Sequence, residues 1–285
     1  MAFGRKRRRR GGGLLFKLLC LAALLAAIWA HGNALIFTDE YEVSLAGLPP
    51  AFEGYRVAQV SDVHGGDLLG LGGKRLLEKL EKAKPNLIVV TGDVVDDDHG
   101  PETVRALMRG LAAIAPTYYV TGNHEWSARV VPELMELLQD CGVTPLRNEF
   151  AYLTLGTNRL LLAGVEDKAG PWDQKTPAEL MEEIEAEDYA GPVLLLAHRP
   201  DDAETYDALG YDLIFSGHVH GGMLRLPFLG GVIAPSRELF PPYTKGLYAL
   251  ENGGQLLVSA GLAPAGNFPR VFNPLQVPIA VLHSA

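Results

Sequence analysis

The chain has 285 residues, of which 48% are hydrophobic and 21% are charged, and its formal net charge is −9. This composition allows one large domain or two small ones, and it excludes a disordered or repetitive protein. Residues 1–30 carry seven of the 25 Lys and Arg side chains and no acidic side chain, so the remainder is strongly acidic. Because an acidic body is poorly suited to bind a phosphate backbone, we expect metal cations or metal-held anions as ligands and no nucleic-acid partner.

The amino terminus predicts a membrane segment. Residues 1–13 form a basic tail, and residues 14–37 are mostly apolar and are interpreted as a signal-anchor helix. Because the uninterrupted apolar core is shorter than the ~20 residues of a full span, Lys17 must snorkel and the span must continue to Phe37. A cleaved signal peptide and a helix lying on the membrane surface are the alternatives. Anchor and signal peptide both place the rest of the chain outside the cytoplasm.

In the body, residues 38–285, short aliphatic runs alternate with amphipathic segments. This alternation predicts a parallel sheet covered by helices, and without a linker it indicates one domain of two sheet halves packed face to face. Strands are expected at 55–60, 87–91, 117–120, 152–155, 159–163, 193–197, 212–215, 223–226, 246–250, 255–258 and 277–282, and helices at 74–82, 101–114, 132–139 and 176–187.

Five of the expected strands end in side chains that can bind a metal ion. Each is ordinary by itself, since an Asp after glycine is usually a turn and a His after a strand usually has a structural role. Together they would meet at the edge of an α/β sheet where ligands bind. Carboxylate, amide and imidazole groups suit Mn, Fe, Zn or Co, and the lack of thiolates argues against a structural zinc site. The residues are Asp62, His64, Asp93, Asn123, His124, His198, His218 and His220.

The same series resembles the calcineurin-like metallophosphoesterase superfamily over residues 55–282. Gly92-Asp93, the Gly-Asn-His-Glu at 122–125 and the Gly-His-Val-His at 217–220 stand in that family's order, and their flanking residues resemble its bacterial membrane-associated phosphodiesterase subgroup. The resemblance implies a four-layer α/β/β/α sandwich, here preceded by the signal-anchor helix. It also implies a hydrolase of phosphoester bonds with a binuclear metal centre.

The resemblance assigns roles to these residues. One ion would be held by Asp62, His64, Asp93 and His220, and the other by Asp93, Asn123, His198 and His218, so that Asp93 bridges them. Two such ions can activate a bridging hydroxide and clamp the phosphate for in-line attack. His124 would protonate the leaving alkoxide or stabilise its charge, and Asp96 would orient His124.

Several side chains near these motifs could face a substrate. Arg199 could contact its phosphate, Glu166 and Asp167 could line the site, and Trp126 and Trp172 could stack on a base or sugar. For each of them a surface or packing role remains the alternative.

We interpret the protein as a phosphodiesterase or pyrophosphatase that acts on small, lipid-linked or nucleotide-type phosphates. A membrane anchor favours lipid-linked substrates by proximity. Asp97 stands where protein phosphatases of the superfamily carry arginine, which weakens a phosphoprotein substrate. The alternatives are an exported soluble phosphodiesterase or nuclease and a non-catalytic metal-binding scaffold, although scaffolds typically lack a ligand that this chain retains.

Overall fold

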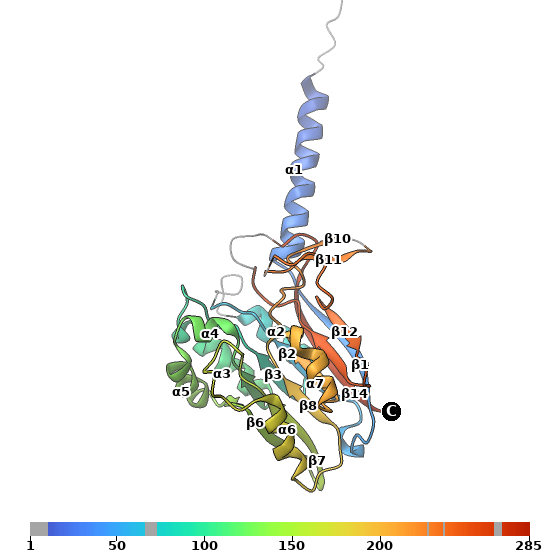
Figure 1. Cartoon of the computed structure of the whole chain (residues 1–285). Coiled ribbons are helices and arrows are strands. Elements are labelled where there is room, and N and C mark those ends of the chain that lie inside the picture. Colours follow the sequence, from blue (N-terminus) through green and yellow to red (C-terminus); the bar gives the residue numbers. More distant parts are fainter. Residues whose placement is uncertain (1–10, 66–72, 227, 236, 265–269) are drawn as a thin grey trace, which may run out of the picture.

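A computed structural model of the chain (Figure 1) describes residues 11–65, 73–226, 228–235, 237–264 and 270–285. Residues 1–10 of the expected basic tail lie outside this part. A long helix, α1 (Gly11–Asn33), projects from one end of a body that is built on two six-stranded sheets.

The first sheet has the strand order β1-β14-β2-β3-β4-β5. Strands β2 to β5 are parallel, β14 pairs antiparallel with β2, and β1 pairs parallel with β14 along the edge. The carboxyl ends of β2, β3 and β4 therefore meet at one edge. The strands are β1 (Ile36–Leu45), β2 (Tyr55–Val60), β3 (Leu87–Thr91), β4 (Thr117–Val120), β5 (Thr144–Pro145) and β14 (Leu275–Ser284).

The second sheet has the order β12-β13-β9-β8-β7-β6, with its central strands parallel. A separate two-stranded ribbon, β10 (Leu224–Leu226) with β11 (Gly230–Ile233), lies at the base of α1 (Figure 1). The strands of the second sheet are β6 (Glu149–Leu155), β7 (Asn158–Gly164), β8 (Val193–Leu196), β9 (Leu213–Ser216), β12 (Gly246–Ala249) and β13 (Gln255–Val258).

Three apolar layers hold the sheets and helices together. In β3, Ile88 and Val90 pack toward the helices of the first sheet, whereas Leu87 and Val89 pack between the two sheets. A strand that is buried on both faces needs a continuous aliphatic run, and that run is what the sequence shows. The four-layer sandwich is therefore confirmed. The helices are α2 (Lys74–Ala83), α3 (Arg105–Ile114) and α5 (Val131–Asp140) on the first sheet, α6 (Pro177–Glu185) and α7 (Ala203–Ala208) on the second, the short α4 (Asn123–Ser127), and the 3₁₀ turns η1 (Pro50–Phe52), η2 (Pro101–Val104) and η3 (Pro200–Asp202).

Helix α1 is mostly apolar, and its side chains are exposed over residues 13–27. Among the described residues one stretch, Gly13–Asn33, is long and apolar enough to cross a membrane. The helix ends at Asn33, and the buried Ile36 begins β1 by pairing with Leu275. Residues 35–37, which we expected to lengthen the span, are therefore at the edge of the sheet. The body begins at Ile36 rather than at residue 38.

Candidate metal centre

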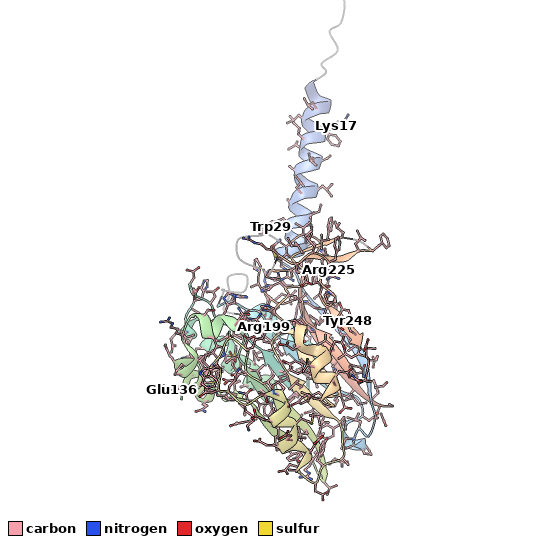
Figure 2. All side chains as sticks on the ribbon, viewed as in Figure 1. Lys17, Trp29, Glu136, Arg199, Arg225 and Tyr248 are labelled. Atoms are coloured by element: carbon pink, nitrogen blue, oxygen red, sulfur yellow. The ribbon has the colours of Figure 1, made fainter. Side chains whose placement is uncertain are left out.

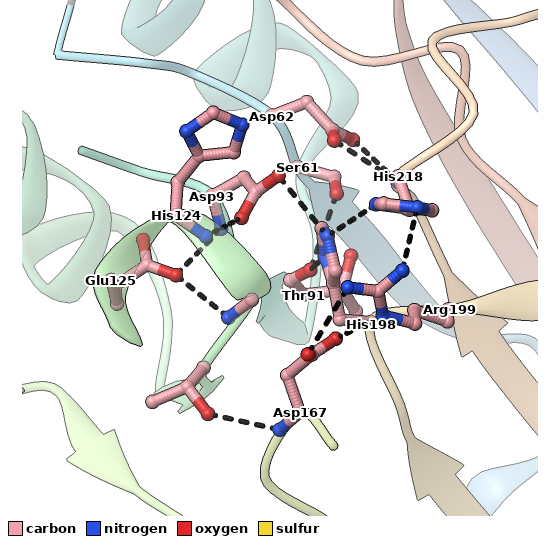
Figure 3. A network of polar contacts seen from close by, with 12 residues as sticks. Ser61, Asp62, Thr91, Asp93, His124, Glu125, Asp167, His198, Arg199 and His218 are labelled. Carbon is pink, nitrogen blue, oxygen red and sulfur yellow. Dashed lines mark hydrogen bonds and ion pairs between the residues drawn. The ribbon is translucent and has the colours of Figure 1, made fainter. Parts of the chain in front are cut away.

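The predicted ligands come together at the carboxyl ends of five strands (Figure 3). Asp62 follows β2, Asp93 follows β3 and Asn123 follows β4 in the first sheet. His198 follows β8 and His218 follows β9 in the second sheet, so the centre is built where the two sheets face each other.

These side chains form two clusters of potential ligand atoms that lie within 4.8 Å of one another. One cluster is Asp62, His64 and His220, and the other is Asp93, His198 and His218. Asp93 also groups with His64 and His124, and its Oδ2 is 3.1 Å from His198 Nε2 and 4.0 Å from His64 Nε2. Asp93 thus lies between the two clusters, where a bridging ligand is required.

The distances between ring nitrogens fit a metal ion in each cluster. His64 Nε2 lies 3.2 Å from His220 Nε2, and His198 Nε2 lies 3.2 Å from His218 Nδ1. Two nitrogens bound about 2.1 Å from one ion are separated by about 3.0–3.4 Å, so this spacing matches shared coordination.

Hydrogen bonds at the far side of two rings fix the nitrogen that faces the centre. His198 Nδ1 donates to Thr91 O at 2.7 Å, and His220 Nδ1 donates to Ala263 O at 3.1 Å. Because a carbonyl only accepts, Nδ1 carries a proton in both rings, which leaves Nε2 as the nitrogen that faces the centre and is placed to bind a metal ion. A backbone carbonyl is a usual hydrogen-bond partner for the ring nitrogen of a metal-binding histidine that does not contact the metal.

Asn123 provides a separate indication of a cation. Its Oδ1 is buried and has no hydrogen-bond partner among the described residues. A buried carbonyl oxygen without a partner is costly, and a metal ion would satisfy it. The residues present therefore fit two metal ions.

Burial and neighbouring charges shift the pKa values of the imidazoles. Burial and the nearby His220 lower the pKa of His64 to about 4, and burial with the nearby His198 lowers that of His218 to about 4. Burial also disfavours the charged form of His198, but the Asp93 carboxylate outweighs it and raises the pKa to about 10. Neutral His64 and His218 are in the protonation state that metal binding needs.

The backbone at the centre is strained. Asp62, His64, Asp93, His218 and His220 all have φ between 48° and 68°, in the left-handed region. This conformation costs a non-glycine residue roughly 1–2 kcal/mol, and such residues concentrate at functional sites. The strained positions coincide with five of the seven predicted ligands.

Two glycines allow the strand ends to approach each other. Gly92 has φ of 82°, and a Cβ there would lie 2.4 Å from Gly122 N. A Cβ on Gly122 would lie 2.2 Å from Asp93 Oδ1. Gly92 therefore makes room for the Gly122 backbone, and Gly122 makes room for the Asp93 carboxylate.

Glu125, the last residue of the Gly-Asn-His-Glu motif, ties two of these loops together. Its fully buried carboxylate accepts hydrogen bonds from the backbone N–H of Gly122, Asp93, Val94 and Val95 at 2.7–3.3 Å. Burial and the nearby Asp93 charge raise its pKa to about 7. The sequence did not predict this role of Glu125, because the carboxylate bonds a loop 32 residues away.

Asp96 and His124 are not paired with each other. Asp96 Oδ1 bonds His99 Nδ1 at 2.8 Å, and its Oδ2 lies 3.7 Å from His64 Nδ1, so it faces the far side of a predicted ligand. The ring of His124 packs edge-on against His64, with centroids 4.6 Å apart, while its buried Nδ1 has no partner among the described residues. The orientation of His124 by Asp96 therefore finds no support in these contacts, because the turn at 96–99 directs the carboxylate to His99.

Arg199 and Asp167 adjoin the second cluster. Arg199 Nε donates to Asp167 Oδ2 at 2.7 Å, and its Nη1 lies 3.0 Å from His218 Nε2 (Figure 3). Beyond this pair opens a pocket of about 370 Å³ that Lys168 and Trp172 also line. Trp172 is 96% exposed.

The other two candidates have mainly structural partners. Trp126 packs against the core beside α5 and donates to Thr121 Oγ1, so the packing alternative holds for it. Glu166 lines the pocket and pairs with Arg147 at 2.7 Å.

Sequence comparison assigns the chain to a family. Residues 55–222 match the profile of the calcineurin-like phosphoesterases, and the chain belongs to this family. It is 30% identical over 224 residues to the metallophosphoesterase YkuE of Bacillus subtilis, covering 75% of this chain and 74% of that protein. The chain is thus a metallophosphoesterase, a hydrolase that acts on phosphoester bonds.

Three further similarities bear on its activity and location. The phosphodiesterase YaeI of Escherichia coli is 32% identical over 170 residues, 58% of this chain and 59% of that protein. A transmembrane protein with a metallophosphoesterase domain from Danio rerio is 26% identical over 258 residues, 86% of this chain and 57% of that protein. The crystal structure of a dimetal phosphatase from Danio rerio superposes with a TM-score of 0.50 at 14% identity, covering 81% of this chain and 93% of that one, which supports the fold.

Proposed function

We propose that the protein is a phosphodiesterase that uses two metal ions and is held at the membrane by α1, with its catalytic body outside the cytoplasm. The observation that carries this proposal is the pair of ligand clusters with Asp93 between them. Asp62, His64, Asp93 and His220 would hold one ion, and Asp93, Asn123, His198 and His218 the other. When bound, such ions polarise the phosphoryl group and lower the pKa of water.

His124 is positioned to serve the leaving group. Its backbone N–H donates to Asp93 Oδ1 at 2.9 Å, which fixes the residue beside the predicted bridging carboxylate. Neither ring nitrogen of His124 has a hydrogen bond among the described residues, so the ring can donate a proton to a departing alkoxide.

Arg199 is the best candidate for a phosphate-binding cation. Asp167, whose side chain is fully buried, holds the guanidinium by Nε and Nη2. When His218 Nδ1 serves as a ligand, its Nε2 keeps the proton and no longer accepts from Arg199 Nη1. That N–H then becomes a donor for a substrate phosphate oxygen.

The pocket beyond Arg199 favours a diester over a monoester. A phosphodiester carries a second organic group, and the pocket lined by Lys168, Trp172 and Arg199 offers room for it next to His198. The similarity to the phosphodiesterase YaeI, at 32% identity over 170 residues, agrees with this preference.

Helix α1 and the basic residues before it support the membrane location. An exposed apolar helix of this length is stable in a bilayer, and a basic tail is retained on the cytoplasmic side. Small or lipid-linked phosphoesters are the proposed substrates, and the identity of the metal is open among Mn, Fe, Zn and Co.

Turnover measurements test the proposal. The full chain in detergent is stripped of metal, reloaded with each ion separately, and compared on bis-p-nitrophenyl phosphate and p-nitrophenyl phosphate. We expect faster hydrolysis of the diester and a loss of at least about 100-fold in His124→Ala, within the range of general acid catalysis. Arg129→Ala, on a residue outside the centre, serves as the matched control and should retain the parental rate.

Two results would contradict the proposal. If no metal supports hydrolysis of either ester, the protein is a metal-binding scaffold rather than an enzyme. If the monoester is the better substrate with every metal, the hydrolase assignment remains and the diester preference is wrong.

A further inference from the structure

Exposed apolar side chains gather around the base of α1. Outside α1, all but two of the large exposed hydrophobic residues described lie in residues 35–37 or 226–272. The two exceptions, Leu155 and Trp172, belong to the β6–β7 turn and the pocket. We call the following six side chains the apolar collar: Leu226, Phe228, Leu229, Leu239, Phe240 and Phe272.

The collar is one connected unit. Its hairpin β10–β11 is bridged to Leu239 through Ile233 and to Val271 through Leu224. Phe240 N donates to Val232 O at 2.9 Å, and Arg225 N donates to Val271 O at 3.1 Å. These pairings hold segments far apart in sequence against one ribbon, which runs sideways from the base of α1 in Figures 1 and 2.

The helix is joined directly to this unit. Asn33 Nδ2 donates to Arg270 O, and Arg270 N donates to Asn33 Oδ1, both at 2.9 Å. Gly32 packs so closely that a Cβ there would lie 2.3 Å from Arg270 O. Phe272 of the collar follows two residues later, so the collar is fixed in position relative to the end of α1.

The same unit reaches the metal centre. The fully buried Arg270 donates to Ala263 O at 2.7 Å, and Ala263 O also accepts from the predicted ligand His220. Asn273 Nδ2 donates to His220 O at 2.6 Å. Leu224 of β10 is only four positions after His220, a chain length that spans at most about 14 Å. The collar, the end of α1 and the centre are thus neighbours.

A bilayer is the occupant that fits this surface. The apolar face of α1 is covered only when lipid surrounds it, and Trp29 lies in its last turns, where aromatic residues favour the lipid–water interface (Figure 2). Side chains that surround the exit point of such a helix meet the same interface. Phe and Leu side chains gain free energy there by entering the acyl region.

We propose that the apolar collar is a second membrane-contact surface, which seats the metal centre at the lipid–water interface so that phosphoesters of membrane lipids reach it. The proposal rests on the membrane location proposed for α1. It narrows the substrate class to phosphodiesters whose organic group is embedded in the bilayer. The exposed segment 237–240 contains one positive residue, Arg237, and one negative residue, Glu238, so its formal charge is zero. The membrane contact is therefore apolar and should persist at high salt.

Depth-dependent quenching tests the contact without using activity. The full chain, carrying Cys20→Ser to remove the exposed thiol, is placed in vesicles of equal parts phosphatidylcholine and phosphatidylglycerol. Leu229→Cys is labelled with bimane, and Leu155→Cys, on the β6–β7 turn, provides the matched control. We expect nitroxide-labelled lipid to quench the label at 229 strongly and the label at 155 little.

Equal quenching at the two positions would overturn the proposal. So would a label at 229 that is shielded from water but not quenched by lipid, because that result indicates a protein occupant such as a second copy of the chain. If the whole protein fails to associate with the vesicles, the proposed anchor is itself wrong.

A kinetic comparison tests the consequence for substrates. The esters are hexadecyl p-nitrophenyl phosphate in vesicles and methyl p-nitrophenyl phosphate in solution, which share the reacting group. The triple variant Phe228→Ser, Leu229→Ser and Phe240→Ser should lose at least about tenfold on the hexadecyl ester, because the polar side chains no longer gain free energy by entering the acyl region, and it should keep its rate on the methyl ester. Leu155→Ser should change neither rate.

An unchanged hexadecyl rate, or a parallel fall for both esters, would refute the role of the collar. If the parent hydrolyses neither ester, the phosphodiesterase proposal fails instead, and the quenching result still decides whether the collar contacts lipid.

Discussion

At the scale of single residues, Asp93 lies between the two clusters. Its carboxylate is within reach of His198 on one side and His64 on the other. Burial disfavours its charge, but the nearby His198 and further histidines hold its pKa well below the ordinary value. The side chain is therefore an anion placed among imidazoles, as a bridging ligand must be.

Replacing Asp93 should consequently empty both ion sites. An amide has one ligand oxygen and no charge, so Asp93→Asn should lower the bound metal from about two ions per chain to less than one. His220→Asn, which alters one cluster, should leave about one ion. Metal analysis of the dialysed proteins measures this difference, and equal metal contents in the two variants would contradict the bridging position.

At the scale of elements, the turns after β3 and β4 are held together by Glu125. Its carboxylate satisfies backbone N–H groups of both turns, so the predicted ligands Asp93 and Asn123 are placed relative to each other through one side chain. Helix α4 begins with this capping interaction. The short helix thus orders the centre although it contributes little to the core.

The variant Glu125→Gln should loosen this connection. One half of the amide is an NH₂ group, which cannot accept hydrogen bonds from the backbone N–H groups that the carboxylate oxygen now satisfies. We expect the free energy of unfolding to fall by about 2 kcal/mol. For a body of this size that corresponds to a fall in Tm of about 5 °C. Differential scanning calorimetry of the metal-free full chain in detergent measures it. Glu133→Gln, on the exposed face of α5, should leave Tm unchanged, and the same result for both variants would exclude the structural role of Glu125.

The sequence predicted the elements whose periodicity is unambiguous. Strands β2, β4 and β13 have the expected limits because mainly apolar runs end there at Ser or Thr. Strand β1 was not predicted, because the polar run Thr38-Asp39-Glu40 interrupts its apolar pattern, and the strand forms by pairing with β14. The predicted helix 101–114 begins as the 3₁₀ turn η2, since Pro101 sets its first turn.

The order of the motifs along the chain predicted which residues meet at the centre. The directions in which their side chains point could not be predicted and are seen only in the structure. Asp96 follows Asp93 by three residues in the familiar pattern, yet the turn at 96–99 directs its carboxylate to His99 and His64. The support that Asp167 gives Arg199 joins residues 32 apart in sequence, and no local pattern reveals it. The contact of Asn33 with Arg270 spans 237 residues and was equally invisible.

At the scale of the whole molecule, the last turn of α1 is built into the body. Asn33 exchanges two hydrogen bonds with Arg270, and the Arg270 guanidinium is held by the carbonyls of Asn273, Ala263 and Ala260. A signal peptide that is removed leaves no contacts in the mature protein. Cleavage after Ala34 would separate Asn33 from the body and leave polar groups at Arg270 without partners.

We therefore expect the chain to keep its amino-terminal segment. Intact-mass analysis of the protein from the membrane fraction should give the mass of the full chain, about 30.8 kDa apart from processing of Met1. The variant Asn33→Ala removes both hydrogen bonds and tests the contact separately. A protease should then cut the chain at residues 34–35 faster than in the parent, while α1 stays in the membrane. Asn158→Ala, in the distant β6–β7 hairpin, should show no faster cutting there. A mature protein that begins at His31 or Leu35 would show instead that α1 is a cleaved signal, and the body would then be an exported phosphoesterase.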